Sequence, residues 1–295
     1  MSLIEEAAKR LRELEATGVT PMVPPLAPSA PGPQPRRAAP EAKKRPPEPK
    51  PAQVRNLDLA RLQAAGFITP ALEHSKLLHE FRVIKRPIVQ AALGRTAAPG
   101  LNRNLIMVTS ATPGEGKTFV ALNLAMSLAM EMDSRVLLVD ADVVRPSLPK
   151  VLGLGMEPTK GLLDLLTNPD TSFDEALIGT NVERLRLLSA GTPHASAAEL
   201  LASEAMTSLL NEMSTRYPDR IAVFDSPPLL ATTEARALAM HMGQVVVVVE
   251  AENTTQHQLE SALATVEACP LVYTLLNKAP DSRVASYYDA YAYAP

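Results

Sequence analysis

Short, almost continuously apolar runs recur between residues 105 and 276, and most of them are separated by segments with helical spacing. Strands of this composition have no polar side to show to water, so they belong in a sheet covered on both faces. Their alternation with helices predicts an α/β fold: a P-loop NTPase-like, doubly wound, mostly parallel sheet flanked by helices. The predicted strands are 105–109, 136–139, 185–188, 221–224, 245–249 and 271–276.

The pattern before residue 105 is different. Residues 1–18 carry Leu3, Ala7, Leu11 and Leu14 at helical spacing, which predicts a short amphipathic helix. Its apolar face is explained equally by a helix that folds back on the main domain and by an element that docks on a partner. Residues 57–94 are predicted to be helical with a break at Pro70.

A proline-rich segment separates these two helical regions. Between Pro21 and Pro51 lie 12 of the 27 prolines, with almost no large apolar residues. Such a composition predicts a disordered linker over residues 19–56 that adds nothing to a core. The domains expected are therefore the helix 1–18, the linker 19–56, a main domain over 57–283 and a flexible tail over 284–295.

Composition narrows the class of protein. The 46% apolar content is ample for a large core. The chain contains no run of about 18 apolar residues, so we expect no membrane-spanning helix. One cysteine, Cys269, excludes an intramolecular disulfide framework, so we expect a cytoplasmic protein. The net charge of −3 gives no sign of a nucleic-acid partner, although the linker has a basic run at residues 43–45.

A glycine-containing loop follows the first predicted strand. Residues 111–118 read Ala-Thr-Pro-Gly-Glu-Gly-Lys-Thr, and an apolar helix pattern from Thr118 to about Met130 comes next. Gly114 and Gly116 allow backbone N–H groups to converge on phosphate oxygens, Lys117 can reach the terminal phosphates, and the Thr118 hydroxyl can ligate Mg²⁺. The sequence therefore predicts a site for a nucleoside triphosphate.

Acidic residues close two other predicted strands. Asp140 and Asp142 follow the strand 136–139, and Asp225 follows the strand 221–224. Ligands of open α/β sheets bind at the carboxyl ends of the strands, so these carboxylates are expected beside the phosphates. There they can orient Mg²⁺ or accept a proton from an attacking hydroxyl.

Four of the six tyrosines lie in the last nine residues: Tyr287, Tyr288, Tyr291 and Tyr293. They sit among Ala, Asp and Ser at a terminus, without the spacing that core packing requires. Phenols on a flexible tail can act as phosphoryl acceptors, and phosphorylation would add about −1.5 to −2 charges to each. The alternative interpretation is a disordered aromatic tail without this function.

Over residues 75–295 these features together resemble the bacterial tyrosine kinases of exopolysaccharide synthesis, within the MinD/ParA-like P-loop superfamily. The resemblance rests on Walker A at 110–118, a second Asp-containing Walker motif at 138–146, Walker B at 223–228, Asn277-Lys278 and the tyrosine cluster. The N-terminal helix and proline-rich segment resemble the cytosolic, exosortase-associated branch. Glu80 to Arg86 resembles the family's oligomerisation signature.

The resemblance implies an autokinase that uses ATP and Mg²⁺. Lys117, Asp140, Asp142 and Asp225 would be catalytic, with Asp140 as the candidate base and the roles of Asp140 and Asp142 exchangeable. Thr118, Asp142 and Asp225 would serve the metal. The expected nucleotide-binding residues are Ala111, Thr112, Pro113, Gly114, Glu115, Gly116, Lys117, Thr118, Phe119, Arg145 and Asn277.

The resemblance implies two partners. The first is other copies of the chain, whose tails would enter neighbouring sites. The second is a separate transmembrane chain-length-determinant (polysaccharide co-polymerase) activator, which would recruit the kinase to the inner membrane. Two other functions remain open: a MinD/ParA-type ATPase that does not phosphorylate protein, and a nucleotide-binding adaptor. The ATPases carry a signature lysine where this chain has Thr112, which argues against the first alternative. The intact acidic residues argue against the second, a catalytically idle adaptor.

Overall fold

The structure is a computed structural model. It describes residues 51–280 except 52, 73–74, 95–101, 133, 156–158 and 217–218, and all of these lie within the compact unit Pro46–Pro295. The predicted N-terminal helix, nearly all of the predicted linker and the tyrosine tail lie outside the described residues.

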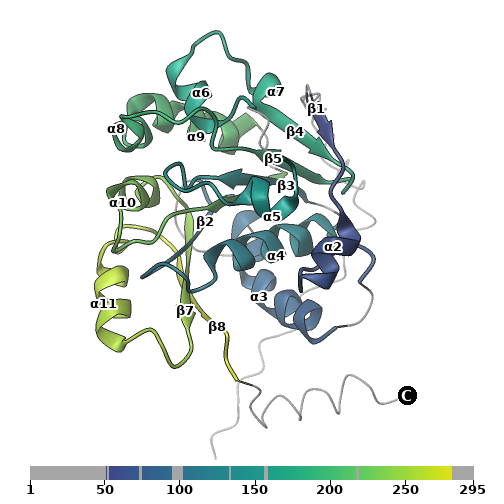
Figure 1. Ribbon diagram of the computed structural model, residues 1–295. Coiled ribbons are helices and arrows are strands. Elements are labelled where there is room, and N and C mark those ends of the chain that lie inside the picture. The colour runs from purple at the N-terminus through teal and green to yellow at the C-terminus, as the bar shows by residue number, and fades with distance from the viewer. Residues whose placement is uncertain are drawn as a thin grey trace, which may run out of the picture. The chain divides into compact units, whose positions relative to one another are not determined.

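The described residues form an eight-stranded sheet with the order β1-β4-β5-β3-β6-β2-β7-β8. All neighbouring strands are parallel except β4 and β5, which pair antiparallel. The strands are Gln53–Arg55 (β1), Leu105–Ser110 (β2), Arg135–Asp140 (β3), Leu177–Thr180 (β4), Leu185–Leu188 (β5), Arg220–Asp225 (β6), Gln244–Glu250 (β7) and Val272–Asn277 (β8). Figure 1 shows the strands between two helical layers.

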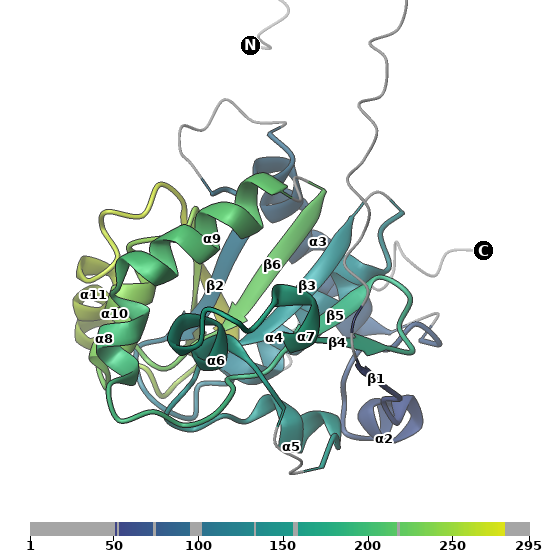
Figure 2. The same ribbon diagram turned by 90° about the horizontal axis from the view of Figure 1, so that it is seen from above.

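Each face of the sheet has its own hydrophobic core. Along β2, Leu105 and Met107 belong to one core, and Ile106 and Val108 belong to the other, because successive side chains of a strand point to opposite faces. This two-sided burial explains why the strands are apolar at nearly every position. In Figure 2, α9 crosses in front of the strands and α3 lies behind them.

The helices divide between the two faces. The second core, with Ile106, contains α2 (Leu59–Ala64), α3 (Lys76–Ala92), α4 (Lys117–Ala129) and α5 (Leu148–Leu152). The first core, with Leu105, contains α6 (Leu162–Thr167), α7 (Phe173–Ala176), α8 (Ala197–Leu201), α9 (Glu204–Arg216), α10 (Thr233–Ala239) and α11 (Gln256–Ala264).

The helix α4 lies in the middle of its layer and is buried at every position from Val120 to Ala129. Its side chains are apolar nearly all round, as expected of a helix enclosed on all sides. The buried Asn123 accepts a hydrogen bond from Ile68 N at 2.7 Å, which ties the segment between α2 and α3 to α4. Packing along the whole of α4 thus fixes the position of its first residues, which adjoin the phosphate loop.

All six predicted strands are confirmed, with ends that differ by at most one residue. Two strands were not expected. β4 is short and follows α7 directly, and β1 lies inside the segment 19–56 that composition assigned to a disordered linker. β1 pairs with β4 from Gln53 to Arg55, so among the described residues the sheet begins at Gln53, ahead of the expected domain start at residue 57. Edge pairing through backbone groups needs little side-chain burial, which is why composition missed it.

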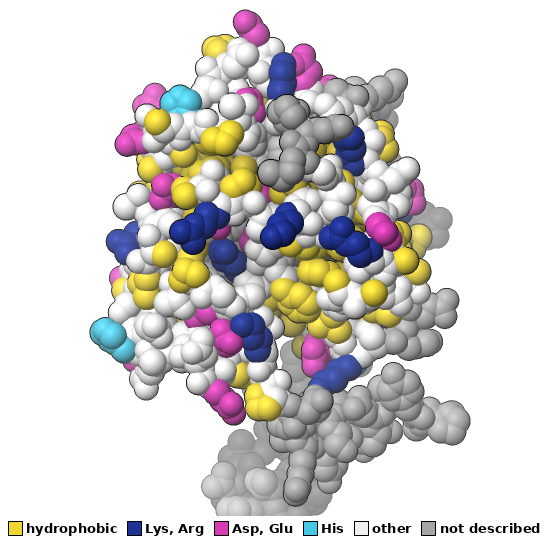
Figure 3. Space-filling view, in the orientation of Figure 1, with side chains coloured by type: hydrophobic (Ala, Val, Ile, Leu, Met, Phe, Trp, Pro, Cys, Tyr) yellow, Lys and Arg dark blue, Asp and Glu magenta, His cyan; other side chains and the backbone are white. Residues whose placement is uncertain are grey.

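The motif expected to mediate oligomerisation lies on α3, and one of its cations is engaged inside the fold. Lys85 is buried, donates to Ser127 O at 2.8 Å and pairs with Glu131 at 2.5 Å. Glu80, Arg82 and Arg86 are exposed. On the face seen in Figure 3, acidic and basic side chains are both spread over the surface, in line with the small net charge. None of the described helices has the length and apolar composition needed to cross a bilayer.

Candidate functional site

The loop between β2 and α4 has the backbone of a phosphate-binding loop. β2 ends at Ser110, α4 begins at Lys117, and Gly114 and Gly116 have φ angles of 92° and 100°. Residues with a Cβ rarely adopt such angles, so the loop depends on glycine at both positions. Gly116 is also the N-cap of α4 and has no capping side chain, so the N–H groups of the first turn remain available to an anion.

Glu115 was predicted to bind the cofactor, but its side chain faces into the protein. It is fully buried and accepts hydrogen bonds from Thr112 N at 2.8 Å and from the Thr254 hydroxyl. The side chain therefore braces the loop, and its backbone N–H is the group left for a phosphate. Phe119 likewise packs its ring on Phe67, with 5.3 Å between ring centroids.

The three predicted acids converge beside this loop. Asp140 and Asp225 are the last residues of β3 and β6, and they are register partners in the parallel ladder. Val108 of β2 is the partner of Asp225 on its other side. Asp142 lies two residues beyond β3 and pairs with Lys117 of the loop, with 3.5 Å between Nζ and Oδ2.

Burial dominates the electrostatics of these acids. It raises the pKa of Asp140 to about 8, with a further rise from the neighbouring Asp225, while the hydrogen bond from Leu148 N lowers it. Burial also raises the pKa of Asp225 to about 6, against the lowering effects of the Thr118 hydroxyl and the Lys117 ammonium. Two neighbouring carboxyl groups that are buried away from solvent are costly to ionise together unless a cation lies beside them.

The oxygens of the acids differ in what they contact. Asp142 Oδ1 accepts from Arg145 N at 3.0 Å and its Oδ2 faces Lys117, so both oxygens are engaged. Asp140 Oδ2 accepts from Leu148 N at 3.1 Å, whereas Asp140 Oδ1 and both oxygens of Asp225 are buried without a well-formed hydrogen bond. The hydroxyls of Thr118 and Ser147 lie near enough to Asp225 to lower its pKa although neither completes such a bond.

This arrangement fits a cation bound together with phosphates. Asp140 Oδ1 and both oxygens of Asp225 are buried without a well-formed hydrogen bond, and a cation bound beside them would satisfy these oxygens. Among the described residues, no group of three or more His, Cys, Asp or Glu side chains is placed to hold a metal alone. Mg²⁺ commonly takes one or two protein ligands and fills its other positions with phosphates and water, which suits Thr118 and Asp225.

Ser147 is a candidate that the sequence did not single out. Its hydroxyl lies 3.1 Å from the Thr118 hydroxyl and, like that hydroxyl, lowers the pKa of Asp225. It reaches the site because the turn after Asp142 leads directly into α5. The sequence carried no signal for it, because a serine before a short helix is also an ordinary N-cap residue.

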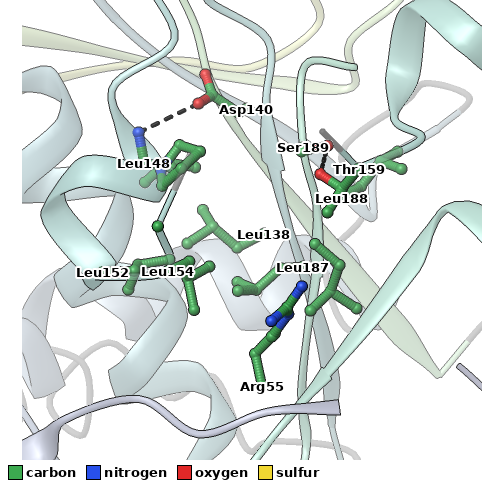
Figure 4. Close-up of a pocket in the computed structure, with 13 residues that line it drawn as sticks. Arg55, Leu138, Asp140, Leu148, Leu152, Leu154, Thr159, Leu187, Leu188 and Ser189 are labelled. Carbon is green, nitrogen blue, oxygen red and sulfur yellow. Dashed lines mark hydrogen bonds between the residues drawn. The ribbon is translucent and has the colours of Figure 1, made fainter. Parts of the chain in front are cut away.

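A hollow of about 480 Å³, open to solvent, lies beside Asp140. Figure 4 shows leucines from β3, α5 and β5 around it, with Asp140 at one end and Arg55 of β1 towards the other. The hydroxyls of Thr159 and Ser189 lie 3.0 Å apart on its wall. The lining is mainly apolar and Asp140 itself is buried, which agrees with the raised pKa of its carboxyl group.

Asn277 and Lys278 contact the backbone of the phosphate loop. Asn277 Nδ2 donates to Glu115 O at 2.8 Å, and Lys278 Nζ donates to Gly114 O at the same distance. A Cβ on Gly116 would lie 2.1 Å from Asn277 Nδ2. Asn277, which was predicted to bind the nucleotide, thus lies against the loop itself. The four tail tyrosines lie outside the described residues.

Comparison with known proteins agrees with this geometry. A family model described as "AAA domain" matches residues 103–278. Tyrosine-protein kinase YwqD of Bacillus subtilis is 32% identical over 64% of this chain and 75% of its own length. Tyrosine-protein kinase ptk of Acinetobacter johnsonii is 34% identical over 58% of this chain, which spans 22% of that relative's length.

Solved structures show the same fold. The VpsO kinase domain has a TM-score of 0.58 and 26% identity over 69% of this chain and 96% of its own. The chimerical protein CapA2B2 has a TM-score of 0.55 and 25% identity over 75% and 99%. The MinC:MinD complex of Aquifex aeolicus shares the fold at a TM-score of 0.51 and 21% identity, over 62% of this chain and 72% of its own. The chain belongs to the bacterial tyrosine kinases of the MinD/ParA-like P-loop superfamily.

Proposed function

We propose that this chain is an ATP-dependent protein tyrosine autokinase whose acceptors are its own tail residues Tyr287, Tyr288, Tyr291 and Tyr293. The observation that carries the proposal is the meeting of Lys117 with Asp140, Asp142 and Asp225 at the ends of β3 and β6, beside the phosphate loop. Relatives that share this domain are named tyrosine-protein kinases.

The loop residues 111–118 would hold the triphosphate through backbone N–H groups and the start of α4. Lys117 is 16% exposed and so keeps a path to solvent and to the terminal phosphates while paired with Asp142. Mg²⁺, when bound by Thr118 and by Asp225 and Asp142 directly or through water, would neutralise phosphate charge. Phosphoryl transfer asks mainly for such positioning and charge compensation.

Asp140 is the better candidate for the base. Its Oδ2 is held by Leu148 N, while Oδ1 has no well-formed hydrogen bond, although the backbone of Asp142 lies near enough to lower the pKa, so Oδ1 can accept the phenol proton. Asp142 has both oxygens engaged. A base works best when its pKa lies near the working pH, which the raised pKa of Asp140 satisfies better than that of an exposed carboxylate.

The biological setting follows from the relatives by analogy. These relatives include the putative tyrosine-protein kinase EpsB of Ralstonia nicotianae and the chimerical protein CapA2B2. We infer that this chain acts in the cytoplasm, forms homo-oligomers, and is recruited to the inner membrane by a separate transmembrane chain-length-determinant activator. Phosphorylation of its tail would then regulate exopolysaccharide polymerisation and export.

The second candidate is a MinD/ParA-type ATPase, favoured by the shared fold. Thr112 stands at the place of the ATPases' signature lysine, and its N–H is tied to Glu115. The two functions differ in where the γ-phosphoryl group goes: to a tyrosine oxygen or to water.

Incubation of the purified full chain with ATP and Mg²⁺, followed by mass spectrometry, decides between them. The kinase predicts phosphotyrosine at the four tail positions and its disappearance when all four become Phe, while nucleotide binding persists. Tyr273 is the internal control, since it lies on β8 and is half-buried. Release of phosphate without any phosphotyrosine would establish the ATPase instead.

A further inference from the structure

We propose that Lys278 is a positioning residue of the phosphate loop: held by Glu250, its ammonium group fixes the Gly114 carbonyl and so turns the following N–H towards the phosphates. The inference deepens the proposed function but rests on its nucleotide site alone. It holds whether the phosphoryl group passes to tyrosine or to water.

The contacts of Lys278 are short and come from two directions. Nζ donates to Gly114 O at 2.8 Å and pairs with Glu250 Oε1 at 2.9 Å. Lys278 directly follows β8, and Glu250 ends β7, its neighbour in the sheet. The ends of two adjacent strands therefore hold one carbonyl group of the loop.

The geometry of a trans peptide links this carbonyl to phosphate binding. The C=O of Gly114 and the N–H of Glu115 belong to one planar unit and point in opposite directions. The structure contains no cis peptide bond among its described residues, so a carbonyl held on the Lys278 side places this N–H on the opposite side. Asn277 acts on the next peptide in the same way, because its amide holds Glu115 O and so orients the N–H of Gly116.

Glu250 is itself fixed. Its other carboxyl oxygen accepts from Asn253 Nδ2 at 3.1 Å, and its N–H donates to the Thr254 hydroxyl at 3.0 Å. That hydroxyl in turn donates to the buried carboxylate of Glu115. The neighbouring Lys278 lowers the pKa of Glu250, so the carboxylate stays charged at neutral pH. The loop is thus braced through its backbone by Lys278 and through its side chain by Thr254.

The brace contributes little to the stability of the fold. The side chain of Lys278 is 48% exposed, and exposed ion pairs contribute little to stability because water and salt screen them. Its removal should therefore change the loop and leave the rest of the domain intact. This separation makes the role measurable.

The test compares Lys278→Met with Lys278→Arg and with the control Arg216→Met, which breaks the exposed pair of Arg216 with Glu212 on α9. Binding of a non-hydrolysable ATP analogue with Mg²⁺ is measured by calorimetry, and amide hydrogen exchange of residues 112–118 is measured without nucleotide. We expect Lys278→Met to weaken binding about tenfold, as the loss of one charge-assisted hydrogen bond predicts. The Thr112 amide of this variant, which is protected by its hydrogen bond to Glu115 Oε2, should exchange faster because the loop is held less firmly, while Lys278→Arg and the control stay near wild type.

Coupling to Glu250 is tested by Glu250→Gln and by the double variant with Lys278→Met. If Glu250 acts through Lys278, the double variant binds the analogue no more weakly than Lys278→Met alone. Wild-type affinity in Lys278→Met overturns the proposal. Weaker binding with unchanged exchange of the free protein also overturns it, because Lys278 would then touch the nucleotide directly. A wild-type chain that does not bind the analogue overturns the nucleotide site and the brace together.

Discussion

Asp140 and Asp225 end the neighbouring strands β3 and β6 as register partners, and Ala141 N donates to Asp225 O across the same ladder at 2.8 Å. The backbone thus fixes two buried carboxyl groups side by side, whatever their charge. Each raised pKa means that the folded chain holds a proton more tightly than the unfolded chain does. A cation bound beside them would favour the ionised carboxylates and lower both pKa values.

The first prediction concerns the pH dependence of stability. The pKa of Asp140 rises from 3.8 to about 8 on folding. The proton that Asp140 binds therefore contributes to the stability of the fold, and this contribution is fully present below pH 3.8 and is lost as pH rises through about 8. Asp140→Asn removes this loss. At pH 8 and without nucleotide, we expect the variant to unfold at a higher temperature than wild type. Its free energy of unfolding should be larger by on the order of a few kcal/mol. Near pH 4 the two proteins should unfold at similar temperatures.

The matched control is Asp170→Asn, since Asp170 is an exposed carboxylate on a loop. It should follow the wild-type curve at every pH. A difference between Asp140→Asn and wild type that does not change with pH would contradict the proposed burial of charge.

The second prediction is that Lys117→Met abolishes phosphoryl transfer without unfolding the domain. Lys117 neutralises phosphate charge and packs no core, so we expect a loss of at least about 100-fold in the rate of transfer. The melting temperature should stay within about 3 °C of wild type, as for a substitution away from the core. Phosphotyrosine at the wild-type level in this variant would refute the assignment of the loop. Lys160→Met, which breaks the exposed pair with Glu175, is the control.

The third prediction separates two glycines of the loop. Gly114 and Gly116 both have positive φ angles, but a Cβ on Gly114 meets nothing within 4 Å, whereas one on Gly116 lies 2.1 Å from Asn277 Nδ2. Gly114→Ala should therefore cost backbone strain alone, roughly 1 kcal/mol. Gly116→Ala should weaken ATP binding much further. Calorimetry on both variants tests this difference.

Asn277→Ala gives the partner experiment, because it removes the group that the new Cβ would strike. We expect the double variant Gly116→Ala, Asn277→Ala to recover part of the affinity that Gly116→Ala loses. Equal affinities for the double variant and Gly116→Ala would show that the φ angle alone causes the loss.

The sequence predicted the fold and the meeting of the candidate site residues. It did not predict which contacts these residues make. Continuous apolar strands and the loop 111–118 place Lys117, Asp140 and Asp225 at one sheet edge by topology alone. Topology does not fix the direction of a side chain within a loop. The inward turn of Glu115 and the contact of Asn277 with the loop depend on bonds to residues more than 130 positions away in sequence, which no local pattern encodes.

The fourth prediction tests where the folded domain begins. Removal of residues 1–52 should leave thermal unfolding nearly unchanged, since a proline-rich linker buries little surface. Removal of residues 1–58 also deletes β1 and Leu57, which is 3% exposed and exchanges hydrogen bonds with the Asn181 side chain. Burial of one such leucine is worth about 1.5–3 kcal/mol, so this longer truncation should lower the melting temperature measurably.

The shorter truncation also tests whether residues 1–18 dock on a partner. If residues 1–18 bind a membrane activator, removal of 1–52 should lower tail phosphorylation in cells only where that activator is present. Equal loss with and without the activator would show that the segment serves folding instead.

The fifth prediction treats the tail as acceptor and switch. An unphosphorylated tail that enters a neighbouring site meets Asp140, Asp142 and Asp225, and each phosphotyrosine adds about −1.5 to −2 charges to that tail. Like charges in a poorly solvated site repel strongly, so phosphorylation should expel the tail and loosen the assembly. Light scattering before and after incubation with ATP and Mg²⁺ measures this as a fall in mass, and the variant with four Phe residues should keep its mass. An assembly whose mass stays constant while its tail becomes phosphorylated would refute the switch and leave the kinase activity standing.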